Sequence, residues 1–345
     1  HHHHHLHHHH HHHLLEPVPP IARQPDVAAK PEPRDSLNSL LDGAWAGAVA
    51  GIVAETLMHP FDTISTRLKV QGAAADGAAP RYHGLFGTAR TMVREEGAIS
   101  LFNGVSATVL CAVPSSAIYF GVYEWVKAIG LDELEVADGP DKDLGLEADA
   151  VHLAAGVSAE LVSSVVVVPF EVVKSRMQLG FSQYHGTING LLTIARLEGF
   201  AGLFAGYRAC LLQDCSFSGV QFFLYERFRR DIKVNNQDDG PDPDLLEDAA
   251  EDLTAGALAG GLAAFFCNPL DVATARLMTQ ETVPGATRYA GAFDCLFTVA
   301  RTEGLTGLWS GSFARVLSIA PLSAITFGIY ERIKKTLAAA RESQP

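Results

Sequence analysis

Three acidic side chains stand inside apolar segments of this chain and point most directly to chemistry. Glu55, Glu160 and Asp214 each lie in a mostly apolar run that lacks an equal number of bases. Burying a carboxylate without a partner is costly, so an acid in such a run indicates a functional site. A site of this kind favours a cationic or zwitterionic substrate, whereas organic phosphates require clustered lysine or arginine. The alternative is that the acids pair with internal arginines such as Arg208 or Arg315.

The segments that carry these acids belong to a pattern that occurs three times, roughly one hundred residues apart. Each copy has an apolar run, a proline, an acid two residues later and an arginine five residues beyond the acid. Such a repeat predicts three equivalent helical hairpins instead of one irregular core. The three copies are Pro60-Phe61-Asp62 with Arg67, Pro169-Phe170-Glu171 with Arg176, and Pro269-Leu270-Asp271 with Arg276.

Further marks follow each proline in the same order. They are an aromatic-x-Gly, a Glu-Gly, a second aromatic-x-Gly and a closing Tyr-Glu-x-x-Lys/Arg. Five ordered marks in three registers are not expected by chance. The acids and bases of the closing mark are Glu124 with Lys127, Glu226 with Arg229, and Glu331 with Lys334.

The pattern predicts an all-α membrane protein with six transmembrane helices in three pseudo-threefold hairpin repeats. At a rise of about 1.5 Å per residue, each predicted helix is long enough to cross the hydrocarbon layer. A short amphipathic helix is expected in the loop of each hairpin. A soluble helical bundle is the alternative. The predicted spans are 41–70, 105–129, 150–180, 207–230, 250–280 and 312–336.

Composition divides the chain into a leading segment and the repeats. Residues 1–38 are rich in histidine and then proline, with no core to join, and we interpret them as a disordered lead. Acidic stretches separate the repeats, and the loops inside repeats lean basic, which places those loops on the negative side of a membrane. The five cysteines form no Cys-x-x-Cys pair, so no zinc or thioredoxin-type site is indicated. The predicted repeats are 39–130, 148–233 and 248–338.

The three prolines suggest how such a bundle works. A proline deep in a helix removes a backbone hydrogen bond and kinks the helix, so Pro60, Pro169 and Pro269 predict three bends at one depth. The acids and bases beside the bends form one ring of ion pairs, and the closing marks form a second ring at the other end. Two rings that open in turn are the gates of an alternating-access transporter.

From residue 40 to residue 336 these marks resemble the mitochondrial carrier family. The resemblance implies a six-helix carrier of the mitochondrial inner membrane with one central site for a small-molecule substrate. It also implies cardiolipin as a structural lipid near the x-Gly helix starts, a monomer, and no nucleic-acid partner, catalysis or other cofactor. The proline-side gate then faces the matrix, and the closing marks form the cytoplasmic gate.

The chain departs from the family in its matrix gate. The family has a lysine or arginine three residues after each acid, and two of these three positions have lost it. We therefore predict that only Asp62 keeps a partner, that Glu171 and Asp271 lose theirs, and that the matrix gate is the weaker one. The three positions hold Ser65, Lys174 and Thr274.

The substrate contacts that the resemblance implies lie on the even-numbered spans and on the first. The segments around Glu55 and Asp214 are similar to those of S-adenosylmethionine carriers, although Gln213 replaces the arginine of that pattern. In this interpretation Glu55 and Asp214 hold the amino and sulfonium charges, and Gln213 contacts the carboxylate. A small or apolar wall accommodates the adenosine. The wall comprises Cys111, Ala112 and Ser318.

Two alternatives stay open beside this interpretation. Glu55 and His59 are one helical turn apart and, with Asp214 and Cys111, offer ligands for a divalent cation such as iron or magnesium. A non-transporting scaffold that keeps the fold is the other alternative, because two gate bases are missing. An enzyme is not indicated, since the spans contain no paired Glu-x-x-His marks and the chain has no nucleophile elbow.

Overall fold

The computed structural model describes residues 33–73, 81–138, 145–236, 245–283 and 285–342. All of the regular secondary structure in these ranges is helical. The chain separates into two units, His1–Leu41 and Asp42–Pro345, and the repeated marks all lie in the second unit. Most of the predicted leading segment, residues 1–32, lies outside the described residues.

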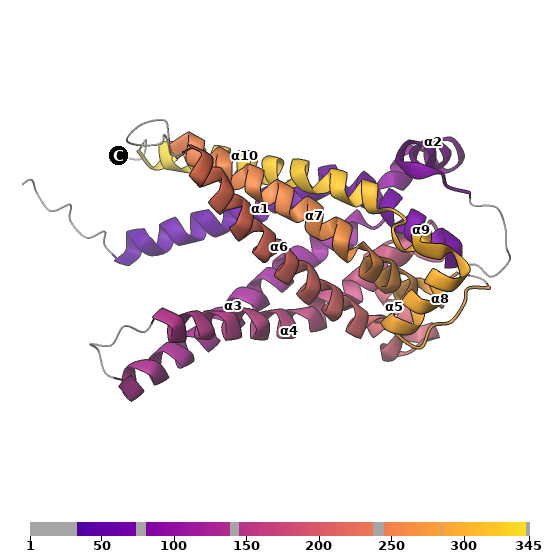
Figure 1. Cartoon of the computed structure of the whole chain (residues 1–345), viewed down its shortest axis with the longest axis horizontal. Helices are drawn as coiled ribbons and strands as arrows, with labels where there is room; N and C mark the ends of the chain where they lie inside the picture. The colour runs from indigo at the N-terminus through magenta and orange to yellow at the C-terminus, as the bar shows by residue number, and fades with distance from the viewer. Residues whose placement is uncertain (1–32, 74–80, 139–144, 237–244, 284, 343–345) are drawn as a thin grey trace, which may run out of the picture. The chain divides into compact units, whose positions relative to one another are not determined.

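Two long helices form each repeat within the described ranges (Figure 1). Three of them begin at the residue that the sequence predicts or immediately beside it, and all of them overlap the predicted spans. Their outer ends differ from the prediction by several residues, because the linkers between repeats continue the helices. The long helices are α1 Pro33–Val70, α3 Val105–Asp138, α4 Gly145–Gln178, α6 Tyr207–Asn236, α7 Leu245–Thr279 and α10 Ser312–Glu342.

Short helices in the loops confirm the predicted hairpin design. The amphipathic helices are α2 Gly84–Glu96, α5 Thr187–Leu197 and α8 Ala292–Thr302, and they lie toward the same end of the second unit (Figure 1). Each packs by its apolar face onto the long helix that precedes it. Ile194 of α5, for example, joins Val172 and Val173 of α4 in one buried cluster. A helical turn follows each Glu-Gly mark: η2 Ala98–Phe102, η3 Phe200–Phe204 and α9 Gly304–Leu308.

We call the first long helix of each repeat (α1, α4 and α7) an odd helix and the second (α3, α6 and α10) an even helix. The glycines before the even helices explain why those helices start where the sequence predicts. Gly104 has a φ of 91°, and Gly206 and Gly311 have φ of 76° and 75°, a left-handed conformation that favours glycine. The same glycines also touch the odd helix of another repeat. A Cβ at these positions would lie 3.0 Å from the Lys174 carbonyl oxygen of α4, 3.2 Å from Met278 of α7 and 2.7 Å from the Ser65 carbonyl oxygen of α1, respectively.

These contacts follow a cyclic order, from repeat 1 to α4, from repeat 2 to α7 and from repeat 3 to α1. The long-helix packing agrees for the first two of these steps, since α3 lies along α4 and α6 lies along α7. Pro60, Pro169 and Pro269 lie inside α1, α4 and α7 as expected. The predicted kinks at these prolines stay a prediction.

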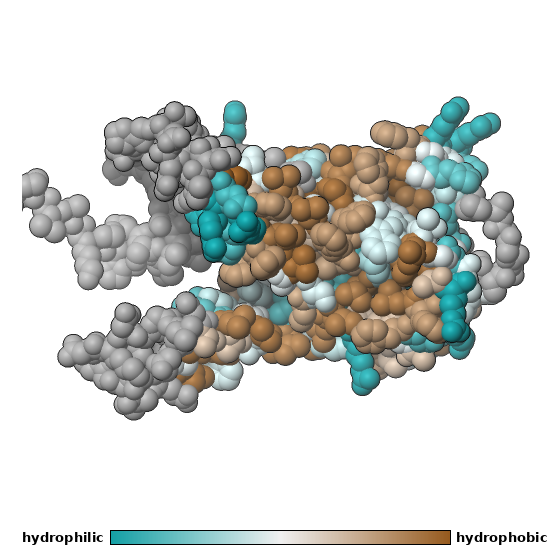
Figure 2. All heavy atoms as spheres, in the orientation of Figure 1, coloured by the Kyte–Doolittle hydropathy of each residue, from teal (hydrophilic) through white to brown (hydrophobic). Residues whose placement is uncertain are grey.

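The outer surface of the second unit is apolar enough for lipid. By length and composition, the segments Ala98–Gly130, Ala150–Gln178 and Leu253–Thr279 each suit a membrane span within the described residues. The helix α6 carries Arg208 and Asp214 in its first turns, which makes it less apolar. Large apolar side chains such as Phe222 are nevertheless exposed, and hydrophobic residues cover much of the visible face between its ends (Figure 2). An exposed apolar surface of this extent indicates a membrane environment.

Candidate functional site

The predicted ion pair between α1 and α4 is present. Lys174 Nζ lies 3.0 Å from Asp62 Oδ2, and the side-chain amide of Gln178 donates a hydrogen bond of 2.8 Å to the same oxygen. Lys174 also lies 3.4 Å from Glu171, three residues earlier on its own helix. One lysine therefore neutralises two acids, and Gln178 reinforces the contact between the helices.

Our prediction that Asp271 loses its partner is wrong. Lys69 Nζ lies 3.6 Å from Asp271 Oδ2, and Arg315 Nε lies 2.8 Å from the same oxygen. Lys69 takes the place of the missing base because it stands one helical turn beyond Ser65, on the same face of α1. Arg315 comes from α10, outside the odd helices to which the sequence rule applies. Ser65 instead donates a hydrogen bond of 3.1 Å to the Gly311 carbonyl.

Glu171 fits the prediction better. Its ion pair in the described part of the chain is the one with Lys174 on its own helix. At the equivalent position of α7, the buried hydroxyl of Thr274 has no hydrogen-bond partner among the described residues. The ion pairs beside the prolines thus join α1 to α4 and α1 to α7, and no ion pair in the described ranges joins Glu171 to α7.

Sequence reasoning missed a second set of contacts that the arginines of the proline mark make. Arg67, Arg176 and Arg276 are among the most buried side chains of the chain. Each forms a two-pronged ion pair with the glutamate of the Glu-Gly mark in its own repeat, and these glutamates are partly exposed. The pairs are Arg67 with Glu96, Arg176 with Glu198, and Arg276 with Glu303.

The same arginines also join the repeats in a closed ring. The Nε of each donates a hydrogen bond to a backbone carbonyl near the end of the next odd helix. The carbonyl belongs to Gln178 for Arg67, to Met278 for Arg176 and to Lys69 for Arg276, at 2.7, 2.9 and 2.9 Å. The threefold recurrence of both marks was the available sequence signal, but a sequence pattern does not state which marks touch.

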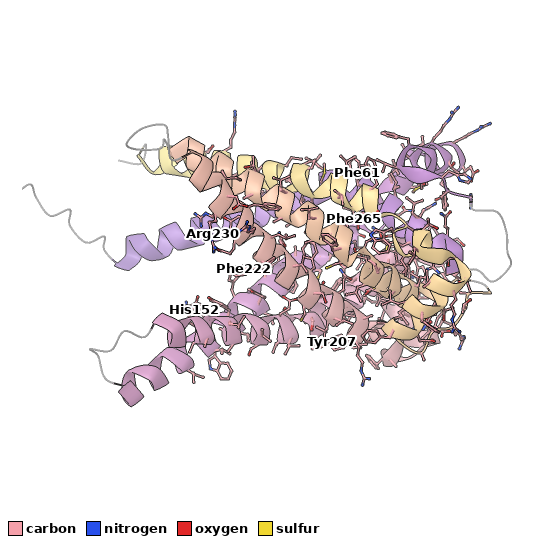
Figure 3. All side chains as sticks on the ribbon, viewed as in Figure 1. Phe61, His152, Tyr207, Phe222, Arg230 and Phe265 are labelled. Atoms are coloured by element: carbon pink, nitrogen blue, oxygen red, sulfur yellow. The ribbon has the colours of Figure 1, made fainter. Side chains whose placement is uncertain are left out.

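The closing Tyr-Glu-x-x-Lys/Arg marks are arranged differently. Lys127 lies 2.6 Å from Glu124 on the same helix, and the Tyr123 hydroxyl lies 3.0 Å from Nδ1 of His152 on α4. In Figure 3, His152 lies farther from the short helices of the second unit than Tyr207 does. Arg229 lies near the ring of Tyr225, and Glu226 is exposed. The side chains of Glu331 and Lys334 lie outside the described residues.

The predicted substrate residues fall into two groups that share one neighbour. Glu55 and Cys111 are both within electrostatic range of Lys174 and Glu171. Asp214 is within range of Glu160, Arg315 and the same Glu171. Glu55, which is exposed, and Asp214, which is half-buried, therefore share Glu171 as a neighbour, with Lys174 and Arg315 as the nearby bases. We call this set of residues the central region.

The polar contacts of the other predicted residues are local. The Cys210 thiol contacts Asp214 at 3.4 Å, and the Ser318 hydroxyl donates to the Arg315 carbonyl at 2.7 Å. Gln213 and Ala112 are half-buried.

All five cysteines are free, and burial raises the pKa of the Cys295 thiol in α8 to about 12, which keeps it protonated.

His59 is engaged in the fold. Its Nε2 lies 2.9 Å from the Asn103 carbonyl, and its side chain is buried. Thr63, one turn later, donates to the Leu101 carbonyl at 2.8 Å. These bonds tie α1 to the segment before α3. Among the described residues, no three histidine, cysteine or acidic side chains come close enough together to hold a metal ion.

Comparison with known proteins agrees with this architecture. The family model described as mitochondrial carrier protein matches residues 37–133, 148–235 and 247–341. Three hairpin repeats with buried charges between their helices define a transmembrane solute carrier. The chain belongs to the mitochondrial carrier family, whose members are transporters, and it is an all-α membrane protein with six transmembrane helices.

Several curated relatives are similar over most of their length. The probable S-adenosylmethionine carrier 2, chloroplastic, of Arabidopsis thaliana is 37% identical over 89% of this chain and 77% of its own. The S-adenosylmethionine carrier 1, chloroplastic/mitochondrial, of the same plant is 37% identical over 90% and 83%. Mitoferrin-1 of Homo sapiens is 31% identical over 84% and 81%.

Proposed function

We propose that this carrier exchanges S-adenosylmethionine for S-adenosylhomocysteine across the mitochondrial inner membrane by alternating access. The observation that carries the proposal is the acidic character of the central region, where Glu55 and Asp214 lie within reach of further acids. S-adenosylmethionine brings an ammonium and a sulfonium group to such a region. The similarity to two S-adenosylmethionine carriers over about nine-tenths of the chain supports the same substrate.

Each predicted residue has a role in this proposal. Asp214 and Glu55 neutralise the two cationic groups, and Gln213 offers its side-chain amide to the carboxylate. Cys111, Ala112 and Ser318 provide a wall of small side chains for the adenosine. The network of Asp62, Lys174, Glu171 and Asp271 closes the matrix side, and the Tyr-Glu-x-x-Lys/Arg marks close the cytoplasmic side. The acid–base pairs hold the closed gate, and their separation opens it.

Uptake into liposomes tests the role of Asp214. The purified carrier with labelled S-adenosylmethionine outside and unlabelled S-adenosylhomocysteine inside should show exchange, and Asp214→Asn should lose at least nine-tenths of it. Hydrogen bonds to charged groups are worth about 1.5–3 kcal/mol, which corresponds to a loss of about tenfold or more. Asp231→Asn is the matched control, because Asp231 lies on the same helix in an exposed pair with Arg227. Full exchange by Asp214→Asn would remove this residue from the site.

Two observations support a lipid site as well. A pocket of about 410 Å³ lies where α6 and α8 begin, lined by Tyr207, Arg208 and Gly291 among others. Two helix N-termini and an arginine at one pocket favour an anionic headgroup. We infer that cardiolipin binds there and that the carrier acts as a monomer. Lipid analysis and the mass of the purified protein in detergent test both statements.

A divalent cation is the second candidate substrate, because the similarity extends to mitoferrin-1. Against it, His59 already bonds to Asn103, and the described residues hold no metal-ligand cluster. Uptake of iron or magnesium that S-adenosylmethionine does not inhibit would favour this candidate. Absence of all flux would favour the scaffold instead. Fractionation of cells that express the tagged chain tests the mitochondrial location, because both plant relatives have chloroplastic in their names.

A further inference from the structure

Arg315 connects the central region to the matrix-side gate. It lies on α10, and its side chain is 27% exposed. Its Nε lies 2.8 Å from Asp271 Oδ2 of α7, and its guanidinium carbon lies 5.6 Å from the ring centre of Phe217 on α6. One side chain thus touches a gate acid on one helix and an aromatic ring on another.

The contact between Arg315 and Asp271 leaves much of the binding capacity of both groups unused. The two atoms are close, but they are not aligned for a hydrogen bond, and neither carboxylate oxygen of Asp271 has a hydrogen-bond partner among the described residues. A guanidinium has five N–H donors in a fork that matches a carboxylate. Arg315 can therefore bind a second carboxylate. If Arg315 moves away, Asp271 keeps its ion pair with Lys69, whose Nζ lies 3.6 Å from Oδ2.

Phe217 places Arg315 beside the predicted site. It stands three residues after Asp214 and four after Gln213, so its side chain neighbours each of them on the surface of α6. The charge of Arg315 also acts on Asp214. The acids of this region repel a substrate carboxylate, and Gln213 is neutral. Arg315 is therefore suited to supply the positive charge that this carboxylate requires.

We propose that Arg315 binds the α-carboxylate of the substrate and releases Asp271 as it does so. This inference rests on the proposed function. Substrate binding then weakens the contact of α10 with α7 and leaves the α1–α7 part of the gate to Lys69. Only a substrate that carries a carboxylate loosens the gate in this way, so Arg315 determines specificity for the zwitterionic end of the molecule.

Decarboxylated S-adenosylmethionine is the probe, because it keeps the amino, sulfonium and adenosine groups. In Arg315→Gln, the KM for S-adenosylmethionine should rise about tenfold or more, since a charged hydrogen bond is lost. The KM for the decarboxylated compound should stay equal or fall, since a positive charge has left an acidic site. Arg288→Gln, an exposed arginine of the loop before α8, should change neither value.

A second variant tests the competition for Arg315. Lys69→Gln combined with Asp271→Asn removes both charges, so that no buried charge is left alone, and it frees Arg315. The KM for S-adenosylmethionine should fall severalfold, with no such change for the decarboxylated compound. Ligand-induced shifts of the melting temperature, measured on each purified variant, report binding where transport is slow.

The outcomes separate this inference from the proposed function. If the wild-type carrier neither takes up nor is stabilised by S-adenosylmethionine, the proposed function falls, and this inference falls with it. If the wild type transports it but Arg315→Gln raises both KM values equally or leaves both unchanged, only the role of Arg315 is overturned. The same holds if Gln213→Ala, and not Arg315→Gln, removes the distinction between the two compounds.

Discussion

At the scale of single residues, Asp271 shows the limit of a rule that is based on position. The sequence rule examines one position, three residues after each acid, and finds Ser65 and Thr274 there. The structure supplies charge to Asp271 from Lys69, one turn further along α1, and from Arg315 on another helix. Long basic side chains reach a shared acid from several backbone positions, so a missing base at one position does not mean a missing pair.

Thr274 offers a test of the incomplete part of this gate. By the threefold repeat, a base at 274 stands to Glu171 as Lys174 stands to Asp62. Thr274→Lys should therefore join α4 to α7, raise the melting temperature of the unloaded carrier by a few degrees and slow exchange severalfold, because the gate opens less readily. Thr306→Lys, on the exposed side of α9, should alter neither quantity. Unchanged stability and exchange rate in Thr274→Lys would contradict this account.

At the scale of elements, the arginines of the proline mark fix each short helix to its long helix. Arg67 has a side chain that is 1% exposed, and its charge is met by Glu96 at the end of α2. The next residue, Glu95, forms a pair with Arg81 on the surface. Two adjacent glutamates therefore have ion pairs in very different surroundings.

This difference gives a matched pair of variants. Glu96→Gln leaves a buried guanidinium without its counter-charge and should lower the free energy of unfolding by on the order of 3 kcal/mol. Glu95→Gln should change it by less than about 1 kcal/mol, because exposed ion pairs contribute little. Thermal unfolding of both proteins in detergent measures the difference. Equal melting temperatures would show that the buried pair does not hold α2 in place.

The starts of the even helices were predictable from sequence because Gly104, Gly206 and Gly311 mark a backbone conformation that favours glycine. The short amphipathic helices were predictable from their apolar spacing. The outer ends of the long helices were predicted several residues too short, although Gly139-Pro140, directly after the end of α3, was an available stop signal. The ring of arginine bonds was not predictable, because it depends on how the repeats pack against one another.

At the scale of the whole carrier, the described ion pairs differ between the two sets of marks. On the proline side they cross from α1 to α4 and from α1 to α7. On the other side the pair of Lys127 lies within its own helix. An alternating-access cycle requires the two sides to exchange these arrangements. In the alternating-access cycle that we propose, the pair of Asp62 and Lys174 separates each time the matrix side opens.

A charge exchange tests whether this pair is the gate. Asp62→Lys alone places two cations together and should abolish exchange of S-adenosylmethionine. Adding Lys174→Asp should restore a substantial part of it, because the attraction returns with its sign reversed. Adding Lys69→Asp instead should not, since Lys69 pairs with Asp271. Equal activity in the two double variants would show that the pairing is not specific.

The closed ring of arginine bonds also constrains how the protein is made. The carbonyl of Lys69 receives its hydrogen bond from Arg276, which the ribosome adds 207 residues later. The last turn of α1 therefore completes its hydrogen bonds only after the third repeat has been synthesised. A chain that ends before Arg276 therefore leaves the Lys69 carbonyl without this bond.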